Sequence, residues 1–314
     1  MRRFRLTDLP IVMGQRDEAR INQAVPLDRC DRPDTPLRDW MRLASATLPR
    51  SGRRVWMARD GWSLLGLVAV RPREGRAAWE IDALIEPAAG DVYLLDLLDR
   101  GVATAGAAGA GRLFLRVPAA SSVVETARRH GFVVVTEETR YVCEQRAVPA
   151  AAPPPARRRE RRHDQTLFRL YTETVPQEVR WHTALSPAEW RAAEEPLGRR
   201  GRAWIIQGDQ SNDTPAALVR LAQDERTSRA ALLTDGHPQS AREAVALALH
   251  AATPPQPLFL LLPTHAASEM AAATEAGFTA LDRFVLLVRP IAQRARRLRV
   301  AERAVDATAT PVTH

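Results

Sequence analysis

Short apolar runs alternate with helically spaced apolar positions through the first half of the chain. Two β-rich runs, VWMARDG and WSLLGLVAV, meet at Asp60-Gly61, a dipeptide that suits a hairpin turn, and the strand-like run AAWEIDALIEP follows them. From Asp91, which can cap a helix, to Ala108 the apolar residues recur at helical intervals. The pattern therefore predicts a hairpin, a third strand and a helix, in this order.

The first half closes with a strand, a helix and a last strand. LFLRV is a short buried run, SSVVETARRHGF has helical spacing, and VVVTEETRYVCE favours a strand. Gly131 can end the helix because a residue without Cβ adopts left-handed backbone at little cost, and Phe132 would then turn back into the core. At the other end, FRLTDL is predicted to open with a strand, and one or two helices are expected before about Arg50.

The second half of the chain repeats this order. LFLLLPTHAASEMAAATEAGF follows the pattern of LFLRVPAASSVVETARRHGF, AWIIQGD follows that of VWMARDG, and FRLYTE that of FRLTDL. The final run ALDRFVLLVRP corresponds to the last strand of the first half. Self-similarity of this length predicts a tandem duplication of one α/β domain.

Composition divides the chain into four parts. The stretch VPAAAPPPARRRERRHDQ predicts an extended, solvated linker over residues 148–165, between domains at 1–147 and 166–291, and residues 292–314 form an arginine-rich tail that we expect to be partly disordered. The linker and the tail hold much of the net charge of +8. The basicity therefore does not describe a uniformly positive binding face.

Several classes of site are disfavoured by composition. The longest apolar runs are far shorter than the ~20 residues of a membrane span, and no apolar stretch follows the basic start MRRFRLTDLP, so we expect a cytoplasmic protein with no membrane partner. Cys30 and Cys143 have no partners at metal-ligand spacing, and the histidines are scattered. Unpaired thiols and no metal site are predicted.

The order of elements resembles the GCN5-related N-acetyltransferase (GNAT) family. The most specific part is RLFLRVPAASSVVETARRHGFVVVTEETRYV, which looks like that family's terminal strand–helix–Gly-Phe–strand segment. The resemblance implies an α/β (α+β) fold of two tandem GNAT-like domains, each a twisted mixed β-sheet flanked by helices. On pattern alone, another βαβ fold stays open.

The resemblance also implies a co-substrate, acetyl-CoA or another acyl-CoA, in a wedge between two parallel strands that splay apart. In the family a loop of pattern (Arg/Gln)-x-x-Gly-x-(Gly/Ala) holds the pyrophosphate at a helix N-terminus. Only Gly90 of this pattern remains in the first copy and only Gly236 in the second. The positions implied for the cofactor in the first copy are Ile85, Gly90, Asp91 and Val92.

A glutamate on the strand before this loop and a tyrosine on the helix before Gly-Phe often act as general base and general acid in the family. Glu80 and Asp82 alternate on a strand so that both point to one face, which makes them the candidate catalytic residues. The alternative is a solvent-facing pair. The tyrosine position corresponds to Ala127 and Ala273, so this role is vacant in both copies.

Three functions follow as hypotheses. The first is an N-acyltransferase, with the first half favoured as the active one, that transfers an acyl group from acyl-CoA to a small-molecule or peptide amine. The second is a non-catalytic GNAT-like scaffold or ligand-binding protein that has lost acetyl-CoA binding. The third is RNA or ribosome binding through the basic segments Arg157–Arg162 and Arg294–Arg303. The sequence leaves the acceptor and the oligomeric state open.

Overall fold

The computed structural model describes residues 1–14, 22–31, 52–85, 91–144, 152–198, 201–208, 215–253 and 255–292. The elements of the first half are β1 (Arg2–Arg3), η1 (Leu6–Asp8), α1 (Leu9–Gly14), η2 (Leu27–Arg29), β2 (Arg54–Asp60), β3 (Ser63–Pro72), β4 (Ala78–Ile85), α3 (Asp91–Ala107), β5 (Arg112–Pro118), α4 (Val123–Arg129) and β6 (Val133–Cys143). Those of the second half are β7 (Ala156–Arg158), η3 (Arg161–His163), α5 (Asp164–Thr174), α6 (Gln177–Thr183), α7 (Pro187–Ala193), β8 (Arg202–Gln207), β9 (Pro215–Gln223), β10 (Ser228–Thr234), α8 (Pro238–Ala251), β11 (Leu258–Pro263), α9 (Ala267–Glu275) and β12 (Thr279–Pro290).

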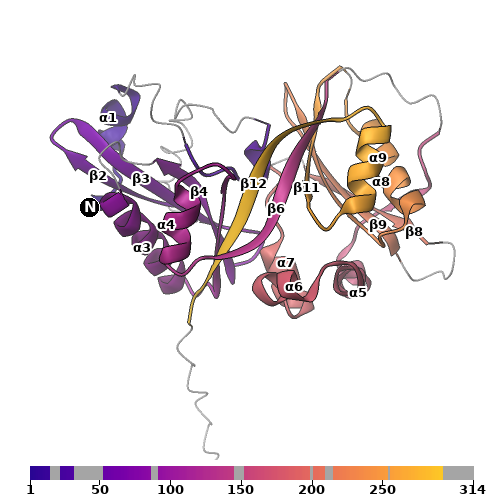
Figure 1. Ribbon diagram of the computed structural model, residues 1–314, viewed down its shortest axis with the longest axis horizontal. Coiled ribbons are helices and arrows are strands. Elements are labelled where there is room, and N and C mark those ends of the chain that lie inside the picture. The colour runs from indigo at the N-terminus through magenta and orange to yellow at the C-terminus, as the bar shows by residue number, and fades with distance from the viewer. Residues whose placement is uncertain are drawn as a thin grey trace, which may run out of the picture.

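One twelve-stranded mixed sheet runs through both halves, in the order β1-β2-β3-β4-β5-β12-β6-β11-β10-β9-β8-β7. The last strands of the two halves have changed places: β12 pairs with β5 of the first half, and β6 pairs with β11 of the second. The two exchanged strands also pair with each other, and they lie side by side in the middle of the molecule (Figure 1). The halves are therefore joined by a continuous ladder of backbone hydrogen bonds.

The strand registers confirm the duplication. Arg3 pairs with Trp56 at the outer edge of the first half, as Arg158 pairs with Trp204 at the edge of the second. The exchanged strands also pair at equivalent positions in the two halves: Pro118 lies opposite Phe284, and Pro263 lies opposite Glu138. The strand exchange is thus internally symmetric, with the same register at both ends.

Two predictions from the sequence differ from the structure. Part of the expected linker, residues 156–165, forms β7, η3 and the start of α5, so the second module begins inside that arginine-rich stretch. An edge strand accommodates arginines because their side chains can point outward, and Arg158 lies over the ring of Trp204. FRLTDL does not open with a strand: β1 precedes it and its residues enter η1 and α1. The tail beyond residue 292 lies outside the described residues.

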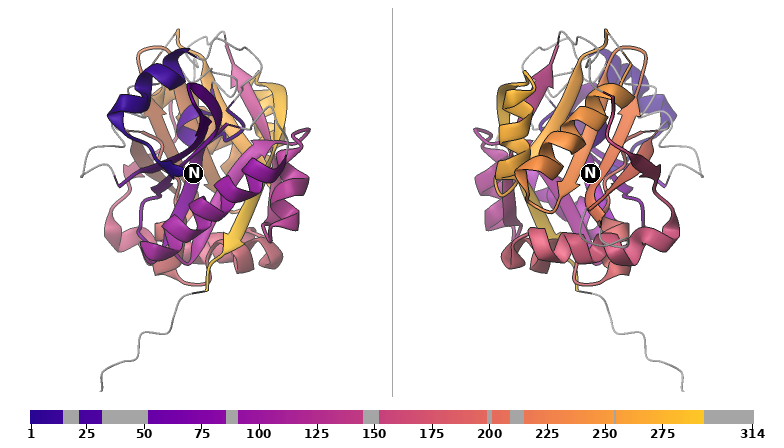
Figure 2. Two further views of the ribbon diagram at one scale, coloured as in Figure 1. Left: turned by 90° about the vertical axis from the view of Figure 1, so that its left-hand side faces the viewer. Right: turned by 90° about the vertical axis from the view of Figure 1, so that its right-hand side faces the viewer.

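Helices cover the sheet on both faces. At the two ends of the molecule, α3 with α4 and α8 with α9 face outward (Figure 2), whereas α5, α6 and α7 lie below the junction of the halves (Figure 1). There α5 packs on β9 and β10, α6 on β6 and β12, and α7 on β4. The helices of the second half therefore also cover strands of the first.

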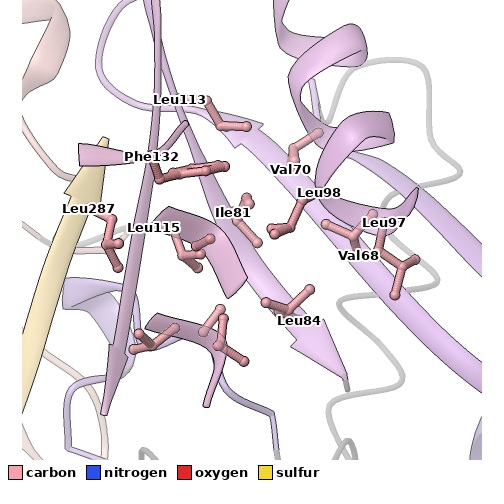
Figure 3. Packing of buried hydrophobic residues seen from close by; sticks show 14 of the residues in the cluster. Val68, Val70, Ile81, Leu84, Leu97, Leu98, Leu113, Leu115, Phe132 and Leu287 are labelled. Atoms are coloured by element: carbon pink, nitrogen blue, oxygen red, sulfur yellow. The ribbon is translucent and has the colours of Figure 1, made fainter. Parts of the chain in front are cut away.

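The exchanged strands complete each other's cores. Leu287 of β12 lies in the core of the first half together with Ile81, Leu113 and Phe132 (Figure 3). In return, Tyr141 of β6 belongs to the core beneath α8 and α9. Because each core borrows side chains from the other half, burial of apolar surface ties the two halves into one folding unit.

The predicted hairpin turn and the predicted ends of two helices are confirmed. The hairpin turns at Gly61, which has a positive φ, and the helices α4 and α9 both end before a glycine with positive φ, Gly131 and Gly277. Phe132 and Phe278 are buried behind them. Both cysteines are buried, and they form no disulfide bond with each other. Within the described residues no helix is long and apolar enough to cross a membrane, and no cluster of three or more metal-binding side chains occurs.

Candidate active site

Among the described strands, each half contains one pair of parallel strands that diverge from each other. β4 and β5 share three paired positions, ending at Glu80 opposite Phe114, and then diverge. β10 and β11 share three as well, ending at Ala230 opposite Leu260. The molecule therefore has two wedges of the kind that the resemblance implied, one in each half.

The first wedge is filled by the chain itself. Segment Asn22–Val25 runs between the diverging strands: the Gln23 N–H donates to the carbonyl of Leu84 on β4 (2.8 Å), and the Val25 N–H donates to that of Arg116 on β5 (2.9 Å). The Asn22 side-chain oxygen also accepts from the N–H of Leu84 (2.8 Å). The segment thus uses the backbone groups that a ligand in this wedge would need.

The predicted catalytic pair, Glu80 and Asp82, lies in a buried ion network. Glu80 accepts from Arg71 and Arg73, at 2.6 and 3.1 Å, and Asp82 pairs with Arg53 at 3.0 Å. Both carboxylates are only 2% exposed, so they are not the solvent-facing pair considered as the alternative. Burial raises the pKa of Glu80, and the two arginines oppose that shift. With these contacts both residues serve the packing of β4 on β3.

The network continues into the second half of the chain. Arg116 of β5 holds Glu138 of β6 and Glu195, which follows α7. Glu195 also approaches Arg73 at 3.6 Å. Burial alone would raise the pKa of Glu195, but Arg116 and Arg73 outweigh it and hold that pKa well below its usual range. These charges join the halves and leave Glu80 without access to a substrate.

The predicted cofactor positions of the first copy are divided. Ile85 is buried and forms a bridge with Asn22, so it belongs to the filled wedge. Gly90 lies outside the described residues. Asp91 and Val92 begin helix α3, and nothing more of them is described.

The second wedge is open. A pocket of about 250 Å³ lies where β10 leaves β11. It is lined by Tyr171, Thr174, Val175, Trp190, Glu194, Leu218, Arg220, Ala231, Leu232, Leu233, Thr234, Gly236, Pro263, His265, Ala266 and Glu269. In β4 every residue is buried, whereas the corresponding part of β10, from Ala231 to Leu233, is partly exposed. The contrast arises because no segment like Asn22–Val25 covers β10 in the part of the chain that the structure describes.

Polar side chains gather at the wide end of this pocket. The Thr234 hydroxyl, at the end of β10, donates to Glu269 of α9 at 2.7 Å, and both side chains are buried. His265 lies between β11 and α9. Burial lowers the pKa of His265, and the nearby carboxylates Glu269 and Glu178 only partly oppose this. At neutral pH His265 is therefore a neutral imidazole that can accept a proton.

The opposite wall of the pocket is apolar and comes from the helices below the sheet. Tyr171 of α5 and Trp190 of α7 have ring centroids 6.2 Å apart, and the Tyr171 hydroxyl is engaged by Thr183. Arg220 of β9 also lines the pocket, and its Nη2 donates to the Glu195 carbonyl (2.8 Å). This wall can hold an apolar group of a ligand next to the polar end.

The loop before α8 stands where the resemblance places the pyrophosphate. Two of its N–H groups are already used: that of His237 donates to the Asp235 side chain (2.9 Å) and that of Gly236 to the Thr234 hydroxyl (3.3 Å). The N–H groups of Gln239 and Ser240, in the first turn of α8, keep their capacity to bind an anion. The Asp235 carboxylate lies beside these N–H groups and would repel phosphates. The wedge is therefore better suited to the thioester arm of a ligand than the loop is to its phosphates.

Reasoning from the sequence missed the residues of the open pocket. The sequence pattern favoured the carboxylates on β4, which only the first copy carries at these positions, because the second copy has Arg229 where the first has Glu80. The sequence signal for His265 was a histidine two residues after the strand-ending Pro263. The vacant tyrosine positions, Ala127 and Ala273, are both buried.

Comparison with known proteins shows the fold. The GCN5-related N-acetyltransferase from Sphaerobacter thermophilus is similar over 92% of this chain and 95% of that one, with a TM-score of 0.56 and 12% identity. A candidate acetyltransferase from Pyrococcus horikoshii is similar over 93% and 90%, with a TM-score of 0.50 and 10% identity. A tandem GNAT protein from the clavulanic acid biosynthesis pathway covers 91% and 94%, at 0.46 and 13%. No protein-family model and no curated protein sequence matches the chain.

Proposed function

On a chain that carries the tandem GNAT fold, we propose an N-acyltransferase whose reaction takes place in the second half. The observation that carries this proposal is the difference between the wedges: the second has a pocket of about 250 Å³ next to a neutral histidine, and the first is filled by Asn22–Val25. The donor is an acyl-CoA and the acceptor is an amine.

In this reaction the acyl-CoA thioester enters the wedge between β10 and β11. His265 takes a proton from the acceptor nitrogen, which attacks the thioester carbonyl carbon. The new C–N bond forms as the C–S bond breaks, and the CoA thiolate leaves with the proton that His265 carried. A neutral imidazole suits both transfers, because it can accept the proton in the first and the imidazolium that forms can donate it in the second.

The N-terminus of α8 would hold the CoA phosphates through the free N–H groups of Gln239 and Ser240. Asp235 opposes this binding by its charge, so we expect weak affinity for CoA itself. For the first half we propose the role of a scaffold, as in the non-catalytic hypothesis. This half supplies β6 to the sheet of the second half.

The proposal is tested by following thiol release from acetyl-CoA in the presence of a panel of primary amines. The wild-type protein should release CoA faster with at least one amine than without, and His265→Gln should lose this amine-dependent rate. His130→Gln, a histidine at the end of α4 in the first half, is the matched control and should keep it. Amine-dependent release that survives His265→Gln would contradict the proposed base.

A further inference from the structure

Glu269 differs from the other acidic residue that lines the open pocket. Glu194 is held by Arg159 at 2.6 Å and thus has its charge compensated. Glu269 has no arginine within ion-pair distance among the described residues, although its side chain is only 7% exposed. A carboxylate buried without a cation is costly unless a ligand supplies the positive charge.

The hydrogen bonds of Glu269 leave one oxygen for a ligand. Its Oε1 accepts from the Thr234 hydroxyl, and no described residue donates to Oε2. The Thr234 bond fixes the carboxylate at the edge of the pocket, since Thr234 is itself buried at the end of β10. His265 precedes α9, whose first turn contains Glu269, so the anion and the proton acceptor lie at the same end of the pocket.

We propose that the acceptor is a small organic cation, a primary ammonium on an aromatic or branched apolar body, whose ammonium group binds Glu269. This rests on the proposed function for the identity of the site and adds what the site selects. Glu269 supplies the counter-charge, and the ring pair Tyr171–Trp190 receives the apolar body. The pocket volume of about 250 Å³ suits a small molecule rather than a peptide chain.

The order of events follows from the charges. The amine arrives as a cation because free alkyl amines are protonated at neutral pH, and Glu269 holds it in that form. The neutral His265 first takes one proton from the ammonium and passes it to solvent, which frees the nitrogen lone pair for attack. As the amide forms, His265 takes the second proton from the nitrogen and gives it to the CoA thiolate. Glu269 is therefore a positioning residue that selects the acceptor, and His265 is the residue that changes protonation.

The test compares two molecules of the same shape, 2-phenylethylamine and 2-phenylethanol, by calorimetric binding to the full-length protein at pH 7 without any acyl-CoA. The wild-type protein should bind the ammonium compound at least about ten-fold more tightly than the alcohol, since a charge-assisted hydrogen bond to a buried carboxylate is strong. Glu269→Gln should remove this preference. Glu275→Gln, an exposed acid on the same helix, should keep it.

Glu269→Asp keeps the charge and should retain part of the preference, which separates a recognition role from a purely structural one. A preference that persists in Glu269→Gln, or its absence in the wild-type protein, would overturn the inference. Because no acyl-CoA is present, failure here is distinct from failure of the proposed acyl transfer. If the protein prefers the ammonium compound but releases no CoA with any amine, the ammonium site is supported and the proposed acyl transfer is contradicted.

Discussion

The two wedges of this protein come from the same duplicated strands and have opposite contents. In the first, Gln23 and Val25 donate backbone hydrogen bonds to β4 and β5, and every residue of β4 is buried. In the second, β10 is partly exposed from Ala231 to Leu233 and a pocket remains. A gap between parallel strands leaves backbone donors and acceptors unpaired, so it must be filled by chain, water or ligand. One copy has used its own chain, and this leaves the other copy for a ligand.

The charges of the two wedges differ in the same sense. Asp82 is neutralised by Arg53, directly before β2, and Glu80 by Arg71 and Arg73, at the end of β3 and directly after it. Glu269 at the second wedge has no such partner among the described residues, and His265 beside it is held neutral by burial. Compensated charges stabilise a fold, whereas an uncompensated one at a pocket is available for binding.

The largest expected effect separates the wedges by catalysis. His265→Gln should lower the amine-dependent kcat by about 10²–10⁴-fold, the usual contribution of a general base. Burial places the pKa of His265 below its ordinary value of 6.5. The wild-type rate should therefore stay level above pH 6.5 and fall only at lower pH, where the imidazole becomes protonated. A pH–rate profile of both proteins checks this. An acid limb that remains in the variant would assign it to another group.

The next effect tests whether the ion network of the first half is structural. Glu80→Gln removes a buried charge between Arg71 and Arg73 and should reduce the free energy of unfolding by about 3–5 kcal/mol. The kcat of the protein that remains folded should change little. Urea unfolding together with the rate per folded molecule measures both. A large loss of kcat at unchanged stability would restore Glu80 as a catalytic residue.

A smaller loss of stability is expected when the segment that fills the first wedge is altered. Asn22→Ala leaves the N–H groups of Leu84 and Ala24 without their side-chain acceptor and should cost about 1–3 kcal/mol of unfolding free energy. Gln23→Ala keeps the backbone bond to Leu84 and removes only the part-buried hydrogen bond that Gln23 Oε1 accepts from the Ser121 hydroxyl (2.8 Å), so it is the control and should cost less. Equal stability of the two variants would contradict the role given to Asn22.

The smallest expected effect concerns the loop of the second wedge. Asp235→Asn keeps a side-chain oxygen for the His237 N–H and removes one negative charge near the N-terminus of α8. If CoA phosphates bind there, affinity for CoA should rise about two- to five-fold, and the gain should shrink at high salt. Calorimetry at two salt concentrations measures this. Unchanged affinity would place the phosphates elsewhere.

Sequence patterns predicted most of the elements but not their partners. The apolar runs and the helix-ending glycines at 131 and 277 located the strands and helices, because those features act locally. The exchange of β6 and β12 is invisible in such patterns, since either strand presents similar apolar residues to β5 or β11. The arginine-rich start of the second module resembled a linker because composition does not report edge pairing with β8.

The candidate site was harder to predict for a related reason. Glu80 and Asp82 have a suitable alternation, but their partners lie elsewhere in the chain, Arg71 in β3 and Arg53 directly before β2. Only the pairing of the strands brings these charges together. The filling of the first wedge depends on hydrogen bonds between residues far apart in the chain, such as Asn22 and Leu84. His265 gained its properties from burial between β11 and α9, which no spacing in the sequence reports.

The most direct test of the central claim is the number of acetyl-CoA molecules bound per chain, measured by calorimetry on the intact protein and on Ala231→Trp, which places a large ring in the second wedge. If the chain fills the first wedge and leaves the second open, the intact protein should bind one acetyl-CoA per chain. Ala231→Trp should bind none, while its thermal unfolding stays cooperative. Two molecules per chain, or one that still binds Ala231→Trp, would mean that Asn22–Val25 does not close the first wedge.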